Sequence, residues 1–188
     1  IGMRDPQAIR LVAQQAEAAG LDSVWAADHV VLPTGSTLPY PYHDDGEFLI
    51  SPRMPFLDHF TCLSYVARIT EHVQFGTAVN LLPLRHPLDV AKTVATLDVL
   101  SGGRVNWGAG RGFDPTEFRS FGVDFSESHP RFRETVEVVL KAWQSERLTH
   151  HGEYYHFDDV EVLPKPAQSP HPPVWLAATS PDSVRWSA

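Results

Sequence analysis

The chain has 188 residues, 43% of them hydrophobic and 20% charged, a balance typical of one globular domain, spanning 1–188, with a full core. Its net charge of −8 argues against nucleic acid and anionic membranes as partners. The single cysteine excludes an internal disulfide, and neither a run of about 18 apolar residues nor a signal-peptide pattern occurs, so we expect a soluble, cytoplasmic protein.

Helices and strands alternate from the start of the chain. The Asp5–Pro6 pair predicts a helix start, and apolar residues recur at helical spacing until Gly20. A short buried strand over 23–26 then ends at Asp28-His29. The segment 30–55 contains five prolines and three aromatic residues, which predicts a long ordered loop or lid.

The middle of the chain continues the alternation. A helix over 57–72 precedes the longest expected strand, over 73–82, and another helix spans 87–100. The glycines after Ser101 stop that helix, and a buried strand follows them into a glycine-rich turn over 108–112.

The last third contains shorter elements. We expect a helical turn at 114–118 and a longer helix over about 130–145. A small hairpin is expected within 149–173, then a last strand over 174–177 and a helix that Ser180 caps.

This order predicts an α/β fold with a parallel sheet of about four strands. Two architectures fit: a doubly wound sheet, or part of an eight-stranded barrel, because about eight strands are needed to close a barrel around packed side chains. A complete barrel takes about 250 residues, so this chain would be roughly half of one.

The glycine-rich turn is the first candidate binding feature. Gly108, Gly110 and Gly112 leave the backbone bare where the strand ends, so that a ligand can approach it closely. Arg111 lies among them and could reach an anion, most plausibly a phosphate. A tight turn with a solvent-exposed arginine is the alternative. A dinucleotide fingerprint is rejected, because the spacing of the glycines and their place in the chain do not match it.

Ligands of such folds lie at the carboxyl ends of the strands, where other polar residues also occur. His29 follows an acid at one strand end and is the histidine expected to act in chemistry. Ser180 and Ser183 at a helix start offer donors to a phosphate, although plain capping of the helix also explains Ser180.

The remaining histidines and the tryptophans favour structural roles. His150, His151 and His156 match no metal-ligand spacing, so we expect a solvated hairpin and no metal site. Trp25, Trp107 and Trp175 are expected in the core, and His86 in a structural position at a helix start.

Several short motifs follow one another along nearly the whole chain. They are Glu17-Ala-Ala-Gly-Leu-Asp-Ser-Val-Trp25 with Asp28-His29; Gly76-Thr-Ala-Val79 with Leu82-Pro83 and Arg85-His-Pro87; Ala95-Thr-Leu-Asp-Val-Leu-Ser-Gly-Gly-Arg104; Gly110-Arg-Gly112; Glu117-Phe-Arg-Ser-Phe-Gly122; and Leu163-Pro-Lys-Pro166 with Pro170-His-Pro-Pro173. In this order they resemble the bacterial luciferase-like superfamily of flavin and deazaflavin oxidoreductases. The resemblance implies a TIM (β/α)8 barrel, of which this chain covers about strands two to five.

The resemblance also implies a function: a flavin-dependent monooxygenase that uses reduced FMN and dioxygen on a small apolar organic substrate. It implies a separate flavin reductase as partner and a homodimer. A deazaflavin-dependent hydride transferase is the first alternative, and a non-catalytic flavin-binding protein or an inactive fragment is the second. The loop with Pro39-Tyr-Pro-Tyr42 resembles deazaflavin-dependent members, whereas Gly110-Arg-Gly-Phe113 resembles FMN monooxygenases.

Site residues follow from the resemblance position by position. His29 corresponds to the active-site histidine, Ala78-Val79 to a non-prolyl cis peptide under the flavin ring, and Arg111, Ser180 and Ser183 to ligands of the flavin phosphate. Val30, Gly110 and Thr179 depart from luciferase itself, which puts light emission in doubt but not flavin binding. The residues expected to bind the cofactor are Ala78, Val79, Gly110, Arg111, Thr179, Ser180 and Ser183.

Overall fold

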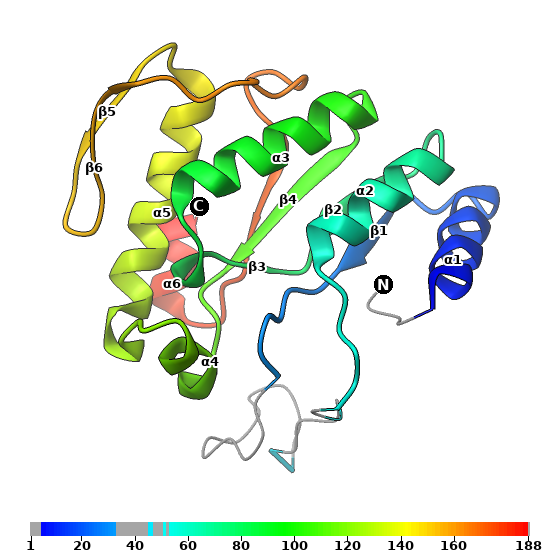
Figure 1. Ribbon diagram of the computed structural model, residues 1–188, viewed down its shortest axis with the longest axis horizontal. Helices are drawn as coiled ribbons and strands as arrows, with labels where there is room; N and C mark the ends of the chain where they lie inside the picture. Colours follow the sequence, from blue (N-terminus) through cyan, green and yellow to red (C-terminus); the bar gives the residue numbers. More distant parts are fainter. Residues whose placement is uncertain (1–4, 33–44, 47–50, 52, 188) are drawn as a thin grey trace.

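A computed structural model describes residues 5–32, 45–46, 51 and 53–187 of the chain (Figure 1). The proline-rich loop, with Pro39-Tyr-Pro-Tyr42, lies largely outside these residues. The helices are α1 (Pro6–Ala18), α2 (His59–Ile69), α3 (Pro87–Ser101), α4 (Pro115–Ser120), α5 (Ser128–Gln144) and α6 (Pro181–Ser187), with 3-10 turns η1 (Leu82–Leu84) and η2 (Phe125–Glu127). The strands are β1 (Ser23–Ala26), β2 (Gln74–Thr77), β3 (Asn80–Leu81), β4 (Val105–Gly110), β5 (Leu148–His151), β6 (His156–Val160) and β7 (Val174–Leu176).

The predicted parallel sheet is confirmed. Its order is β1-β2-β4-β3, and β7 pairs with β4 further along the same strand, all in parallel. Helices α2 and α3 lie on the same face of this sheet, in front of it in Figure 1. In β1, Val24 and Ala26 are buried toward the helices, whereas Ser23 and Trp25 on the other face are only half-buried. Helices α2 and α3 therefore cover one face of the parallel sheet.

The expected strand over 73–82 is wrong in one respect, because it is two strands. β2 ends at Thr77 and β3 begins at Asn80. At the break, the Thr77 hydroxyl donates to the Gly108 carbonyl (2.6 Å) and accepts from the Gly108 N–H (3.0 Å). A side chain thus replaces the backbone ladder at this point, and the peptide between Ala78 and Val79 is cis.

The core lies between the sheet and its helices. The side chains of β4 are buried along the whole strand, and α3 buries residues around much of its circumference, which explains its weak amphipathic pattern. Trp107 of β4 packs edge-on against Trp143 of α5, with ring centroids 5.0 Å apart. Among the described residues, no helix is long and apolar enough to cross a membrane.

Two element boundaries and one tryptophan differ from the sequence-based expectations. The helix expected over 57–72 is shorter, because the Asp58 carboxylate caps it through Thr61 N–H (2.8 Å) and Thr70 has an extended backbone. Trp107 is fully buried and Trp25 half-buried, but Trp175 is 58% exposed because it lies on the open face of edge strand β7. The core prediction is therefore wrong for Trp175.

Candidate active site

The strand ends converge as predicted. The Ala78 N–H donates to the Ala26 carbonyl (2.7 Å), and the Ala177 N–H donates to the Ala109 carbonyl (2.9 Å). The ends of β1, β2, β4 and β7 are thereby tied into one rim. Gly110 brings three of them together, since a Cβ on this residue would overlap the Val79 side chain and lie 3.6 Å from Ala177 Cβ.

His29 follows β1 and pairs with a buried acid. Its Nδ1 lies 3.3 Å from Oε2 of Glu117, and the two side chains are 13% and 3% exposed. The other oxygen, Oε1, accepts the Val30 N–H at 3.1 Å. Phe56 and Phe113 contact the imidazole edge-on, with ring centroids 5.5 and 6.4 Å away. Among the described residues, His29 therefore has two aromatic rings beside it and the Glu117 carboxylate on its Nδ1 side.

Local sequence explains why Glu117 is buried. Asp114 caps α4 by accepting the Thr116 N–H (2.7 Å), which sets where the helix begins. Phe118 is 1% exposed and lies over Gly112, where a Cβ would come within 3.1 Å of its ring. Because Gly112 has φ +84, a conformation that favours glycine, the turn can accept the ring and α4 directs Glu117 at His29.

Asp28, next to His29, holds the scaffold beneath the site. Its carboxylate accepts two hydrogen bonds from Arg85 (2.9 and 2.7 Å) and one each from Asn80 Nδ2 and Leu81 N–H (both 3.0 Å). Burial raises the pKa of Asp28, but the contacts from His59 and Arg85 outweigh it and hold the pKa well below the usual range. Asp28 is thus a permanently charged anchor between β1 and β3.

Arg111 lies at the rim but faces protein groups in this structure. Its Nη1 donates to the Ser128 hydroxyl at 3.0 Å, and its guanidinium lies 5.2 Å from the centre of the Phe125 ring. Burial first, then the charges of Arg111 and Arg133, lower the pKa of His129. The glycine turn and the start of α5 therefore bring Arg111 and Arg133 together around His129, and these two arginines form a basic cluster in an acidic protein.

The start of α6 is capped as the sequence predicted. The Ser180 hydroxyl accepts the Ser183 N–H (3.1 Å), and the Ser183 hydroxyl accepts the N–H groups of Thr179 (3.1 Å) and Ser180 (2.9 Å). The guanidinium of Arg133 lies 5.3 Å from the Trp186 ring, which places α6 beside the basic cluster. The two expected phosphate ligands at this helix, Ser180 and Ser183, thus bond to each other and to the backbone around them in the present structure.

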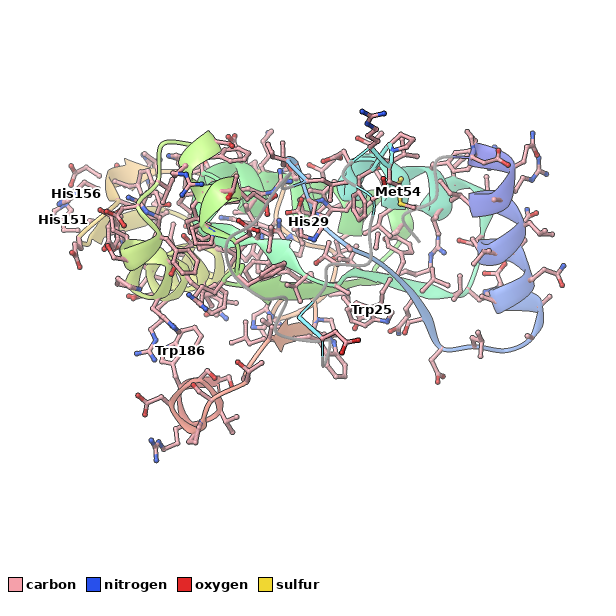
Figure 2. The ribbon with its side chains drawn as sticks, turned by 90° about the horizontal axis from the view of Figure 1, so that it is seen from below. Trp25, His29, Met54, His151, His156 and Trp186 are labelled. Atoms are coloured by element: carbon pink, nitrogen blue, oxygen red, sulfur yellow. The ribbon has the colours of Figure 1, made fainter. Side chains whose placement is uncertain are left out.

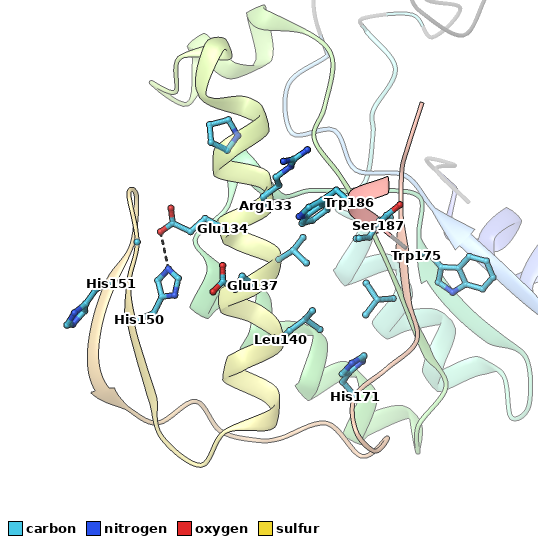
Figure 3. Close-up of a pocket in the computed structure, with 15 residues that line it drawn as sticks. Arg133, Glu134, Glu137, Leu140, His150, His151, His171, Trp175, Trp186 and Ser187 are labelled. Carbon is cyan, nitrogen blue, oxygen red and sulfur yellow. Dashed lines mark hydrogen bonds and ion pairs between the residues drawn. The ribbon is translucent and has the colours of Figure 1, made fainter. Parts of the chain in front are cut away.

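A groove of about 960 Å³ adjoins the basic cluster, because Arg133 and Trp186 are among the residues that line it. Figure 3 shows it between α5 and β7, with Leu140 and Trp186 on its walls and the β5–β6 hairpin at one side. At that side, Nε2 of His150 lies 3.2 Å from Oε1 of Glu134. Glu134 also accepts the N–H groups of hairpin residues 153–155. This groove is therefore a junction of secondary-structure elements and not the meeting point of the strand ends.

The expectation of a solvated hairpin is wrong for His150, which is 7% exposed because Glu134 holds it against α5. His151 is exposed and pairs with Asp158. Within the described ranges, no group of three or more His, Cys, Asp or Glu side chains is placed to hold a metal ion. His86 packs against the rings of Tyr155 and Phe157.

Sequence reasoning assigned no role to Glu117, His129 or the buried His59. Glu117 is 88 positions from His29, so no local spacing connects them. His59 lies 3.2 Å from Asp28 with neither ring nitrogen in a hydrogen bond among the described residues.

Comparisons with known proteins agree with this architecture. The profile of the luciferase-like monooxygenase family matches residues 2–188. The oxygenase component of flavin-dependent trigonelline monooxygenase from Acinetobacter baylyi is 30% identical over 172 residues, covering 90% of this chain and 42% of that protein. The crystal structure of monooxygenase RslO1 from Streptomyces bottropensis superposes with a TM-score of 0.79 at 30% identity, covering 96% of this chain and 50% of that one.

A third similar structure is that of an enzyme named for coenzyme F420. Coenzyme F420-dependent tetrahydromethanopterin reductase from Methanopyrus kandleri has a TM-score of 0.72 at 22% identity, covering 96% of this chain and 49% of that one, and shows the shared fold.

The chain therefore belongs to the luciferase-like monooxygenase family. It spans about half the length of the relatives it matches. The parallel sheet and its helices are accordingly part of an α/β barrel, and the barrel alternative of the sequence analysis is confirmed.

Proposed function

We propose that this chain is the catalytic-site half of a flavin-dependent monooxygenase that uses reduced FMN and dioxygen to oxidise a small apolar organic substrate. The observation that carries the proposal is the pairing of His29 with buried Glu117 at the same rim as the arginine-bearing glycine turn. The two 30% identical relatives, both named as monooxygenases, support it.

The residues at the rim fit a flavin phosphate in chemistry. Arg111 and Arg133 bring positive charge together beside His129, and Ser180 and Ser183 add hydroxyl groups at the neighbouring helix. Gly110 keeps the surface between Val79 and Ala177 low, where any side chain would project. We therefore assign Arg111, Thr179, Ser180 and Ser183 to the phosphate and Ala78, Val79 and Gly110 to the ring.

Proton transfer and the exclusion of water would be the tasks of His29 and of the apolar residues around it. Reduced flavin would supply the electrons for oxygen activation. His29 would hold or transfer a proton at the reacting end, because an imidazole can do either near neutral pH. Phe56 and Phe113 would exclude water around it, which strengthens each polar contact there.

A binding titration tests the cofactor assignment. We expect reduced FMN to bind more tightly than riboflavin, which lacks the phosphate, and Arg111→Ala to weaken FMN about 10- to 100-fold, since a charge-assisted hydrogen bond contributes about 1.5–3 kcal/mol. Arg147→Ala, at the exposed arginine that pairs with Asp159, is the matched control and should leave FMN affinity unchanged. Equal affinity of FMN and riboflavin would contradict the phosphate site.

A deazaflavin-dependent oxidoreductase is the second candidate, because an F420-dependent enzyme shares the fold. Preference for the deazaflavin in the same titration would move the function to hydride transfer, and binding without turnover would favour a non-catalytic flavin protein. The name "oxygenase component" of the Acinetobacter relative supports a separate flavin reductase as partner. A homodimer in the cytoplasm remains part of the proposal.

A further inference from the structure

Glu117 is a buried carboxylate that the roles proposed so far do not use. It lies at the start of α4, yet it contacts the segment after β1 and not its own helix. Its two oxygens are divided between two tasks: Oε1 accepts the Val30 N–H at 3.1 Å, and Oε2 faces Nδ1 of His29 at 3.3 Å. The backbone of the loop and the imidazole ring are thus held by one side chain.

A cation lies near this carboxylate. Burial lowers the pKa of Arg85, but the hydrogen bond and charge of Asp28, with additions from Asp58 and Glu117, raise it overall. A permanent cation therefore lies within electrostatic reach of Glu117. A backbone N–H also donates to it, and an ionised carboxylate can only accept hydrogen bonds.

This arrangement decides which nitrogen of His29 carries the proton. When a carboxylate faces Nδ1, the neutral ring is protonated there, and Nε2 keeps its lone pair. The edge contacts with Phe56 and Phe113 limit rotation of the ring.

We propose that Glu117 is a positioning residue that holds His29 in the Nδ1–H tautomer, so that Nε2 is the atom that accepts a hydrogen bond or a proton from the ligand at the strand ends. The expected effect on turnover rests on the role proposed for His29. The tautomer does not, because it is a property of the chain without any ligand.

The molecule offers a matched control in its other buried histidine–glutamate pair. Glu134 lies 3.2 Å from His150, but on the Nε2 side of the ring. The same reasoning assigns the opposite tautomer, Nε2–H, to His150. One sample therefore contains both expected states.

The test is a long-range 1H–15N correlation spectrum of the 15N-histidine-labelled chain, at a pH above the range in which imidazoles are protonated. We expect His29 as Nδ1–H and His150 as Nε2–H. Glu117→Ala should remove the preference at His29 only, Glu134→Gln should alter His150 only, and Glu117→Asp should retain the His29 tautomer. An Nε2–H tautomer at His29 in the unsubstituted chain would overturn the proposal by itself, even if Glu117→Ala does not fold.

A second readout separates this inference from the proposed function. The probe is reoxidation of bound reduced FMN by dioxygen, for which we expect Glu117→Ala to lower the maximal rate on the order of 10- to 100-fold, with a much smaller change in FMN affinity. Loss of affinity with an unchanged rate would overturn the positioning role. A shifted tautomer with unchanged rate and affinity would overturn the role of His29 in turnover, and with it the part of Glu117 in the reaction.

Discussion

The two buried histidine–glutamate pairs of this protein are similar in distance and differ in what surrounds them. His29–Glu117 and His150–Glu134 are separated by 3.3 and 3.2 Å, and all four side chains are largely buried. Figure 2 shows His29 in the middle of the molecule, whereas His151 and His156 mark the hairpin at one end. The first pair lies at the rim of the parallel strands, and the second fastens a hairpin to α5.

The difference teaches that pairing alone does not identify a reactive histidine. Glu134 accepts backbone N–H groups from three successive hairpin residues, so its pair closes a structural junction. Glu117 accepts from the loop after β1 and adjoins the arginine-bearing turn of β4. Position at the strand ends separates a candidate catalytic pair from a structural one.

Substitution of the two histidines should give the largest difference between the pairs, in the rate of FMN reoxidation and in the melting temperature. His29→Asn is expected to slow reoxidation of bound reduced FMN by about 10²- to 10⁴-fold, the usual contribution of a positioned acid or base. His150→Asn should leave that rate near its original value and lower the melting temperature instead. Stopped-flow absorbance and thermal unfolding measure the two effects, and a slow His150 variant with a normal His29 variant would reverse the assignment.

Glycine-to-alanine substitutions should lower the free energy of unfolding more at the strand ends than in the hairpin. A Cβ at Gly108 would overlap the Thr77 carbonyl, a backbone atom, whereas a Cβ at Gly20 meets nothing within 4 Å and only the strain of its φ of +73 opposes alanine there. We expect Gly108→Ala to cost about 3 kcal/mol of unfolding free energy or more, at the upper end for overpacking. At Gly152 the Cβ would meet the Glu134 side chain and break the hairpin junction only. Urea denaturation gives the three values, and equal losses at Gly108 and Gly152 would contradict the contrast.

Acid should weaken the hairpin junction through Glu134. Burial raises the pKa of Glu134, but the N–H groups of Tyr154 and Tyr155, with His150 and Glu153, lower it overall. A lowered folded-state pKa contributes stability above the unfolded-state value, and that stability is lost as the pH falls through the folded-state value. Unfolding free energy should therefore fall from about pH 5 to about pH 3, and less steeply in Glu134→Gln. Parallel pH curves for the two proteins would contradict this role.

The smallest effect is expected at the aromatic supports of two arginines. Phe125 lies 5.2 Å from the Arg111 guanidinium, and Tyr154 lies 4.3 Å from that of Arg131. A cation–π contact contributes about 0.5–1 kcal/mol at exposed sites, so Phe125→Leu should weaken FMN binding about two- to five-fold. Tyr154→Leu should leave FMN affinity unchanged, and calorimetric titration of both variants decides whether Arg111 needs its aromatic support.

The alternation of elements and the convergence of strand ends could be predicted from sequence, because periodicity and helix caps are local signals. The glycines around Arg111 and the caps at Asp5 and Ser180 are of this kind. The contact of Glu117 with His29 could not, because it joins residues 88 positions apart through the packing of Phe118 on Gly112. The break after Thr77 was missed because its cause, a side chain bonded to Gly108, is also non-local.

The most direct test is an anaerobic titration of the 15N-histidine-labelled chain with reduced FMN, following both buried histidines in one spectrum. The account predicts that the ring signals of His29 shift with saturation of the site, while those of His150 stay in place. A shift of the His150 ring signals with unchanged His29 signals would contradict the assignment of the strand-end pair as the active site. Unchanged His29 signals at FMN concentrations that saturate binding would contradict it as well.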